Sequence, residues 1–147
     1  MKPVYVLNGP NLNLLGKREP GIYGAKTLAD VEADCQTYAK ANSIDVVLHQ
    51  SNHEGDLVSW IHEAGEKGSG VVLNAGAYTH TSIALHDAIK GVDIPVIELH
   101  ISNVHARESF RHHSLMAAAC MGVICGMGTA GYTLALQALT DHLAAQN

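Results

Sequence analysis

The sequence has few cysteines and no pattern that would pair them. Cys35, Cys120 and Cys125 are odd in number, and no two of them have CxxC spacing. This excludes the disulfide framework typical of a small secreted domain and gives no support to a zinc site. We expect all three side chains to be buried apolar thiols.

Long apolar runs are also absent. No uninterrupted apolar segment approaches the ~18 residues that a membrane-spanning helix needs. Met1, Lys2 and Pro3 lead directly into a short strand-like run, not into a signal peptide. We therefore expect no membrane partner and a cytoplasmic location.

Positive charge is scarce and dispersed. The chain has 9 Lys and Arg against 14 Asp and Glu, for a net charge of -5. The basic residues form no cluster or stripe, which argues against nucleic acid as a partner. A small molecule is the favoured partner.

The sequence does contain an alternation of strand and helix patterns within one expected domain, residues 1–147. Hydrophobic residues make up 47% of the chain, enough for a substantial core. Short β-rich runs occur at 4–7, 44–49, 70–74, 94–100 and 122–126. Nearly continuous apolar strands between helices predict a parallel sheet covered on both faces. Five strands favour an α/β, flavodoxin-like, three-layer fold with a five-stranded parallel sheet.

Helical periodicity fills the segments between these runs. Two of the expected helices follow capping-box patterns, Thr27-x-x-Asp30 and Ser51-x-x-Glu54. Two more helices are expected over about 81–90 and about 131–145, the last with an apolar face that includes Tyr132.

Polar residues follow three of the predicted strands, where ligands bind in open parallel sheets. They are Asn8, Asn11, Arg18 and Tyr23 after the first strand, Asn74 and His80 after the third, and His100, Ser102, Arg107 and Arg111 at or after the end of the fourth. All three arginines of the chain are in these segments. Because the guanidinium group suits carboxylates and other anions, this distribution indicates an anionic substrate or a stabilised anion.

The first of these segments, from Asn8 to Gly24, is a long loop rich in Gly, Pro and Asn. Loops of this length are usually functional or disordered, and we interpret this one as an active-site lid. Tyrosine is a poor base at neutral pH because its pKa is near ~10. Arg18 in the same segment could stabilise the phenolate of Tyr23. The alternative is a tyrosine that only packs over the loop.

Glu98 and His100 are two residues apart in the fourth strand-like run, so alternation places them on one face. A carboxylate there would favour the protonated imidazole and make His100 a general acid. The backbone N–H groups of Ile101 and Ser102 could bind a substrate carboxylate. Ser102 could equally be only an N-cap.

The segment GMGTAG, 126–131, matches GxGxxG and makes a flavodoxin-like nucleotide- or flavin-binding module the rival hypothesis. It follows the last strand, however, and no further strand is left to present a ribose-binding acid. We interpret these glycines as a tight turn and close packing of the final helix. The ten histidines show no HExxH motif, so metal binding is possible but has no support in the sequence pattern.

Five segments, in this order, resemble one known family: NGPNLNLLGKREPGIYG, QSNHEGDLVSWIH, LNAGAYTHTSIALHDA, PVIELHISNVHARESFRHHS and GMGTAGYTLAL. Over essentially its whole length the sequence is similar to the type II 3-dehydroquinate dehydratases. The resemblance implies anti elimination of water from 3-dehydroquinate, through an enolate, to give 3-dehydroshikimate. It places the reaction in the shikimate pathway of aromatic amino acid biosynthesis or in quinate metabolism, with no metal and no organic cofactor.

The resemblance also implies residue roles. Tyr23 would be the base, Arg18 and Arg107 would hold it as the phenolate, and Asn11 would stabilise the enolate through an ordered water. His100, beside Glu98, would protonate the departing hydroxyl. The substrate-binding residues would be Asn74, His80, Ile101, Ser102 and Arg111.

One further implied residue belongs to a subunit contact. Asp87 would reach from a neighbouring subunit to the Arg111 position. The family's assembly implies a homo-oligomer, a dodecamer built from trimers.

Overall fold

The computed structural model describes residues 1–146, which form a sheet of five parallel strands in the order β2-β1-β3-β4-β5. The strands are β1 (Val4–Asn8), β2 (Val46–Gln50), β3 (Gly70–Asn74), β4 (Val96–His100) and β5 (Gly122–Cys125). The central strands β1, β3 and β4 are buried along their whole length. The predicted flavodoxin-like sheet is confirmed, and the predicted strand ends differ by no more than two residues from those observed.

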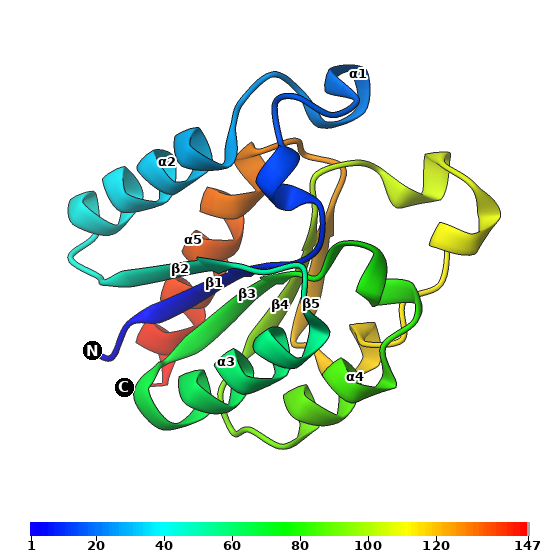
Figure 1. The fold of residues 1–147 in the computed structure, drawn as a ribbon. Helices are drawn as coiled ribbons and strands as arrows, with labels where there is room; N and C mark the ends of the chain where they lie inside the picture. The colour runs from blue at the N-terminus through cyan, green and yellow to red at the C-terminus, as the bar shows by residue number, and fades with distance from the viewer. Residues whose placement is uncertain (147) are drawn as a thin grey trace.

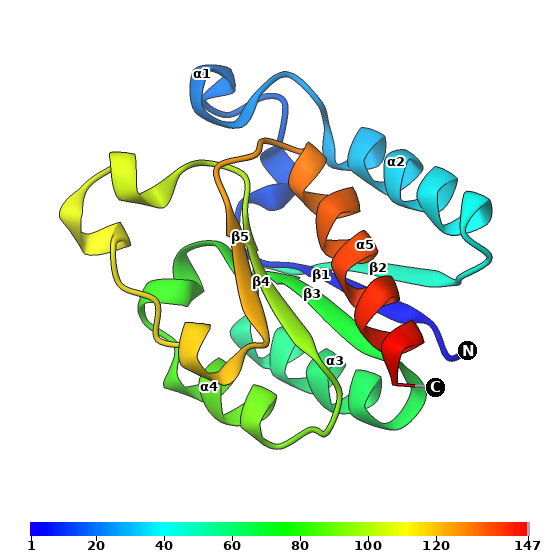
Figure 2. The same ribbon diagram turned by 180° about the vertical axis from the view of Figure 1, so that it is seen from behind.

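Helices cover both faces of the sheet (Figures 1 and 2). On one face lie α2 (Leu28–Ala41) and α5 (Ala130–Ala145), and on the other lie α3 (Glu54–Lys67) and α4 (Ile83–Lys90). A four-residue helix, α1 (Pro20–Tyr23), stands beyond the end of the sheet (Figure 1). Within residues 1–146 no helix combines the length and apolar character that a membrane span requires.

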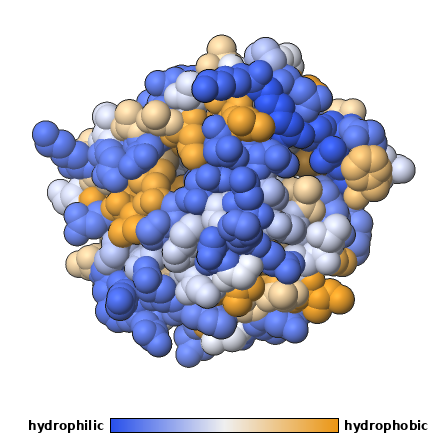
Figure 3. Space-filling model, in the orientation of Figure 1, coloured by the Kyte–Doolittle hydropathy of each residue, from blue (hydrophilic) through white to orange (hydrophobic). Residues whose placement is uncertain are grey.

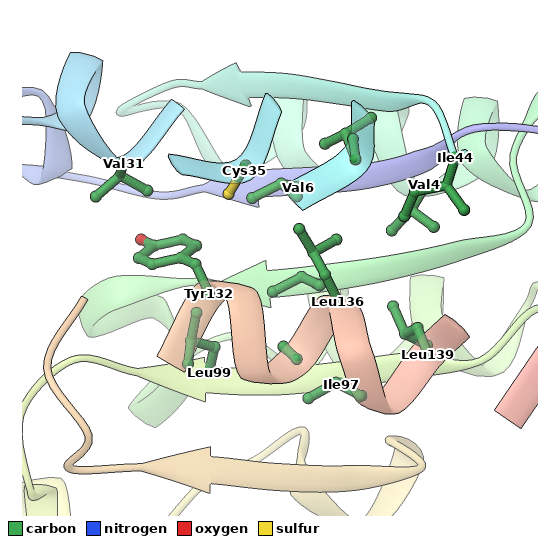
Figure 4. Packing of buried hydrophobic residues seen from close by; sticks show 14 of the residues in the cluster. Val4, Val6, Val31, Cys35, Ile44, Ile97, Leu99, Tyr132, Leu136 and Leu139 are labelled. Carbon is green, nitrogen blue, oxygen red and sulfur yellow. The ribbon is translucent and has the colours of Figure 1, made fainter. Parts of the chain in front are cut away.

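The core consists of two apolar clusters, one on each face of the sheet. The first joins α2 and α5 to alternate residues of the central strands, and Figure 4 shows Cys35 and Leu136 among its side chains. The second joins α3 and α4 to the other strand residues, such as Tyr5 and Leu73, whose side chains are on the opposite face of the sheet. Figure 3 shows that hydrophilic residues cover most of one outer face, with apolar areas in small patches.

The two capping-box predictions have different outcomes. Thr27 and Asp30 form the predicted reciprocal pair, because each side chain accepts a hydrogen bond from the other's backbone N–H, at 3.2 and 3.0 Å. The box at Ser51 is wrong, since α3 is preceded by His53 at its N-cap position and lacks a side-chain cap. Ser51 Oγ instead accepts from His53 N at 2.9 Å and donates to Asp56 Oδ2 at 2.5 Å.

The cysteine prediction holds for one residue of the three. Cys35 is buried between the sheet and α2, and burial raises the pKa of its thiol to about 12. Cys120 and Cys125 are only half-buried. They precede and end β5, which is an edge strand of the sheet and is less covered than the central strands.

The glycine-rich turn between β5 and α5 has the geometry of a tight turn. Gly126 and Gly128 adopt φ angles of +88° and +63°, which favour glycine. A Cβ atom on Gly131 would lie 2.7 Å from Leu99 Cδ1. The glycines therefore serve the turn and the close approach of α5 to β4, as predicted.

Candidate functional site

A cleft of about 590 Å³, including space open to solvent, lies beyond the carboxyl ends of the strands. The three polar segments predicted from the sequence meet there. Predicted site residues that line it are Asn11, Arg18, Tyr23, Asn74, His80, His100, Ile101, Ser102, Arg107 and Arg111. The cleft is thus built mainly from the loops that follow β1, β3 and β4.

Tyr23 is the last residue of α1, and two arginine side chains lie against its ring. The guanidinium carbon of Arg18 is 5.2 Å from the centroid of its ring, and that of Arg107 is 5.3 Å away. Arg18 comes from the same loop, whereas Arg107 follows β4, so the contact joins two distant segments. Both arginines therefore place a guanidinium group against the aromatic ring of Tyr23.

The loop that carries Tyr23 turns through unusual backbone conformations. Gly16 and Gly24, which flank α1, have φ angles of +87° and +82°, and Glu19 is left-handed at +43°. Such conformations cost free energy for a residue with a side chain and occur often at functional loops. The loop reaches the cleft because of these turns.

Asn11 is held in the cleft by residues at and just after the end of β2. Its φ angle of 69° is left-handed, a conformation that asparagine tolerates. Its backbone N–H donates to Asn52 Oδ1 at 3.1 Å, and Gln50 Nε2 donates to the same oxygen at 3.2 Å. Asn52 therefore fixes the loop at the point where Asn11 enters the cleft.

Asn74 belongs to a buried hydrogen-bond chain that the sequence did not reveal. Its Nδ2 donates to the Tyr132 hydroxyl at 3.0 Å, and that hydroxyl donates to Asn8 Oδ1 at 2.6 Å. Burial raises the pKa of Tyr132, which keeps the hydroxyl neutral and able to donate. The sequence predicted Tyr132 only as part of an apolar helix face, and a lone tyrosine among aliphatic residues was its only signal.

Glu98 and His100 lie on one face of β4, as the alternation predicts, and both are buried. Glu98 Oε2 is 2.7 Å from His100 Nε2. The second carboxylate oxygen, Oε1, accepts from Ser114 Oγ at 2.6 Å. Ser114 was missed because it lies in an irregular loop with no spacing relation to Glu98.

The loop after β4 holds the remaining polar groups. Arg107 Nη1 donates to Ser102 Oγ at 3.2 Å. Ser102 is not the N-cap of the following 3-10 helix, because Asn103 occupies that position and its side chain accepts from the His105 backbone. His80 Nδ1 lies 2.8 Å from the His113 carbonyl oxygen, which can only accept, so this nitrogen carries hydrogen.

Two predicted residues, Glu98 and Asp87, do not line the cleft. Glu98 is buried beside His100. Asp87 lies on α4, and its side chain is 73% exposed beside His86. Among residues 1–146, no group of three or more His, Cys, Asp or Glu side chains is arranged to hold a metal ion.

The chain is similar to known proteins over almost its full length. The family model described as dehydroquinase class II matches residues 2–140. The chain is 66% identical to the 3-dehydroquinate dehydratase of Chelativorans sp. (strain BNC1), a match that covers 97% of this chain and 99% of that protein. It is 67% identical to the 3-dehydroquinate dehydratase of Rhizobium johnstonii, with coverage of 94% and 95%.

A solved structure agrees with these matches. The type II dehydroquinase of Propionibacterium acnes superposes with a TM-score of 0.92 at 45% identity, covering 96% of this chain and 97% of that one. These findings do not favour the rival nucleotide- or flavin-binding module. The chain belongs to the class II dehydroquinase family.

Proposed function

We propose that the cleft converts 3-dehydroquinate into 3-dehydroshikimate by anti elimination of water. One arrangement carries this proposal: two guanidinium groups lie against the ring of Tyr23, and His100, which is paired with the buried Glu98, lines the same cleft. An elimination needs a base for the carbon-bound proton and an acid for the leaving hydroxyl, and the cleft offers one of each.

The first step is removal of a proton from the carbon beside the ketone. Tyr23 is the base, and Arg18 and Arg107 stabilise its phenolate form through charge. The negative charge then passes to the substrate as an enolate. Asn11, through an ordered water, stabilises that charge with a donor already in position.

The second step breaks the carbon–oxygen bond. His100 gives a proton to the departing hydroxyl, which leaves as water, and Glu98 stabilises the protonated imidazole. Asn74, held by Tyr132, orients the same end of the substrate ring. All of these roles are filled by side chains and water, so the proposal includes no metal and no organic cofactor.

The remaining groups bind the substrate's polar edge. Its carboxylate lies on the backbone N–H groups of Ile101 and Ser102 at the end of β4. His80 and Arg111 hold the hydroxyl groups. The reaction serves the shikimate or the quinate pathway in the cytoplasm, and residues 1–147 act as one catalytic domain.

The test is ultraviolet absorbance of purified protein mixed with 3-dehydroquinate. The product is a conjugated enone, which absorbs where the substrate does not. We expect the enone signal to grow with time in proportion to protein concentration. Absence of that signal from a folded protein would refute the proposed function.

We also propose that the site is completed in a homo-oligomer, a dodecamer built from trimers. Asp87 does not line the cleft of its own chain and is mostly exposed, which suits a contact with Arg111 of a neighbouring copy. Arg111 has only Glu108 as an ion-pair partner among residues 1–146 of one chain.

Asp87→Ala is therefore expected to raise KM at least about fivefold, or to weaken assembly, because a hydrogen bond to a charged group is lost. Steady-state kinetics and light scattering after size-exclusion chromatography measure the two effects. Asp141→Ala, an exposed aspartate on α5, is the matched control. Unchanged KM and unchanged mass in Asp87→Ala would contradict a shared site.

A further inference from the structure

Ser114 contacts Glu98, the hydrogen-bond partner of the proposed acid His100. It does not line the cleft that we propose binds substrate. We propose that it is a positioning residue: its hydroxyl holds the Glu98 carboxyl group in place as the hydrogen-bond partner of His100, and it thereby supports carbon–oxygen cleavage. This inference rests on the proposed function and assigns a specific step of it to Ser114.

The other contacts of the Ser114 hydroxyl group direct its hydrogen toward Glu98. Ser114 Oγ accepts from the backbone N–H of Met116 at 3.2 Å and of Ala117 at 3.0 Å. A hydroxyl has one hydrogen and two acceptor lone pairs, so these contacts use both lone pairs. The hydrogen is left for Glu98 Oε1, 2.6 Å away.

This donation fixes the orientation of the Glu98 carboxyl group. Glu98 is 2% exposed, so protein groups and not solvent hold its oxygens. Oε1 accepts from Ser114 Oγ, and Oε2 lies 2.7 Å from His100 Nε2, on the ring of the proposed acid. Loss of the Ser114 donor would leave Oε1 buried without that partner and the carboxyl group less firmly held against His100.

Ser114 is itself fixed by the core. The Met116 side chain is fully buried in the apolar cluster beneath α3 and α4. Leu115, which separates Ser114 from Met116 in the sequence, donates its backbone N–H to the Thr79 carbonyl at 2.9 Å. Ser114 is therefore attached to a segment that the core fixes in position. A substitution at Ser114 removes the donor to Glu98 without changing a residue that lines the cleft.

The first experiment compares Ser114→Ala with Ser114→Thr, which retains the hydroxyl. Ser114 is half-buried and is one of the residues that line a second hollow, next to the cleft. For Ser114→Ala we expect kcat to fall by about tenfold to a hundredfold, with KM within twofold of the parent, because a hydrogen bond to a charge is lost. Ser114→Thr should restore most of kcat. Ser59→Ala, an exposed serine on α3, is the control.

The second measurement separates the acid step from general distortion. The reaction is run in D₂O, and substrate recovered at partial conversion is analysed for deuterium at the carbon beside the ketone, with an enzyme-free blank subtracted. If only hydroxyl loss is slowed, more deuterium enters the recovered substrate per product formed. We expect this ratio to rise in Ser114→Ala and to return in Ser114→Thr.

The outcomes are distinct. If the parent protein forms no enone, the proposed function fails. If the parent is active but Ser114→Ala keeps its kcat, or loses exchange and dehydration equally, the positioning role of Ser114 is overturned. If Ser114→Ala does not fold, Ser114→Cys replaces it, since a thiol of similar size is a weaker donor and should give the same change in the exchange ratio.

Discussion

Tyr23→Phe is expected to fold normally and to lose about a hundredfold to ten-thousandfold in kcat, the range that a positioned base contributes. Phenylalanine keeps the ring beside Arg18 and Arg107 but removes the oxygen that we propose takes the proton. Enone absorbance gives the rate, and a thermal melt checks the fold.

Deuterium exchange makes this result specific. Without the base, the carbon beside the ketone should neither exchange nor lose its proton, so recovered substrate should match the enzyme-free blank. Tyr38→Phe, at a half-buried position on α2, is the control. Turnover near the parent level in Tyr23→Phe would rule Tyr23 out as the base.

His100→Gln should lower kcat by a similar factor, because it removes the proposed acid of the second step. Glutamine retains an N–H that can donate toward Glu98, but it has no proton to give to the leaving hydroxyl. We expect kcat to fall by about a hundredfold or more, since general acid catalysis is removed. His62→Gln, an exposed position on α3, controls for the substitution itself.

The exchange measurement again decides the role. In His100→Gln, Tyr23 still takes the proton, so deuterium should enter recovered substrate while little enone forms. Loss of exchange together with dehydration would show that His100 does not act as the leaving-group acid alone. Opposite exchange results in the two variants would assign one residue to each step.

The sheet was predictable because its signals are local. The five apolar runs and the Thr27–Asp30 capping box depend on residues within a few positions of one another, and each appears in the structure. The meeting of the polar segments was predictable for a different reason, since the carboxyl ends of parallel strands share one edge. Ser51 shows the limit: its hydroxyl had several partners within reach, and spacing could not choose among them.

The supporting residues were not predictable, because their contacts are long-range. Ser114 meets Glu98 through the path of an irregular loop, and Tyr132 meets Asn8 across a separation of 124 residues. Neither pairing has a period or a motif. The role of Asn52 likewise could be recognised only in the structure, where its side chain accepts a hydrogen bond from the Asn11 backbone N–H. The sequence thus indicates which groups line the cleft better than which groups hold them in place.

The chain of hydrogen bonds through Tyr132 has a consequence for synthesis of the protein. Asn8 and Asn74 leave the ribosome early, but the hydroxyl that satisfies both of them lies on α5, the last helix. Until that helix has emerged and docked, two amides at the strand ends lack their buried partner. A nascent chain that already contains every residue proposed to contact substrate therefore lacks the support that holds Asn74, and competence should arise only when synthesis is nearly complete.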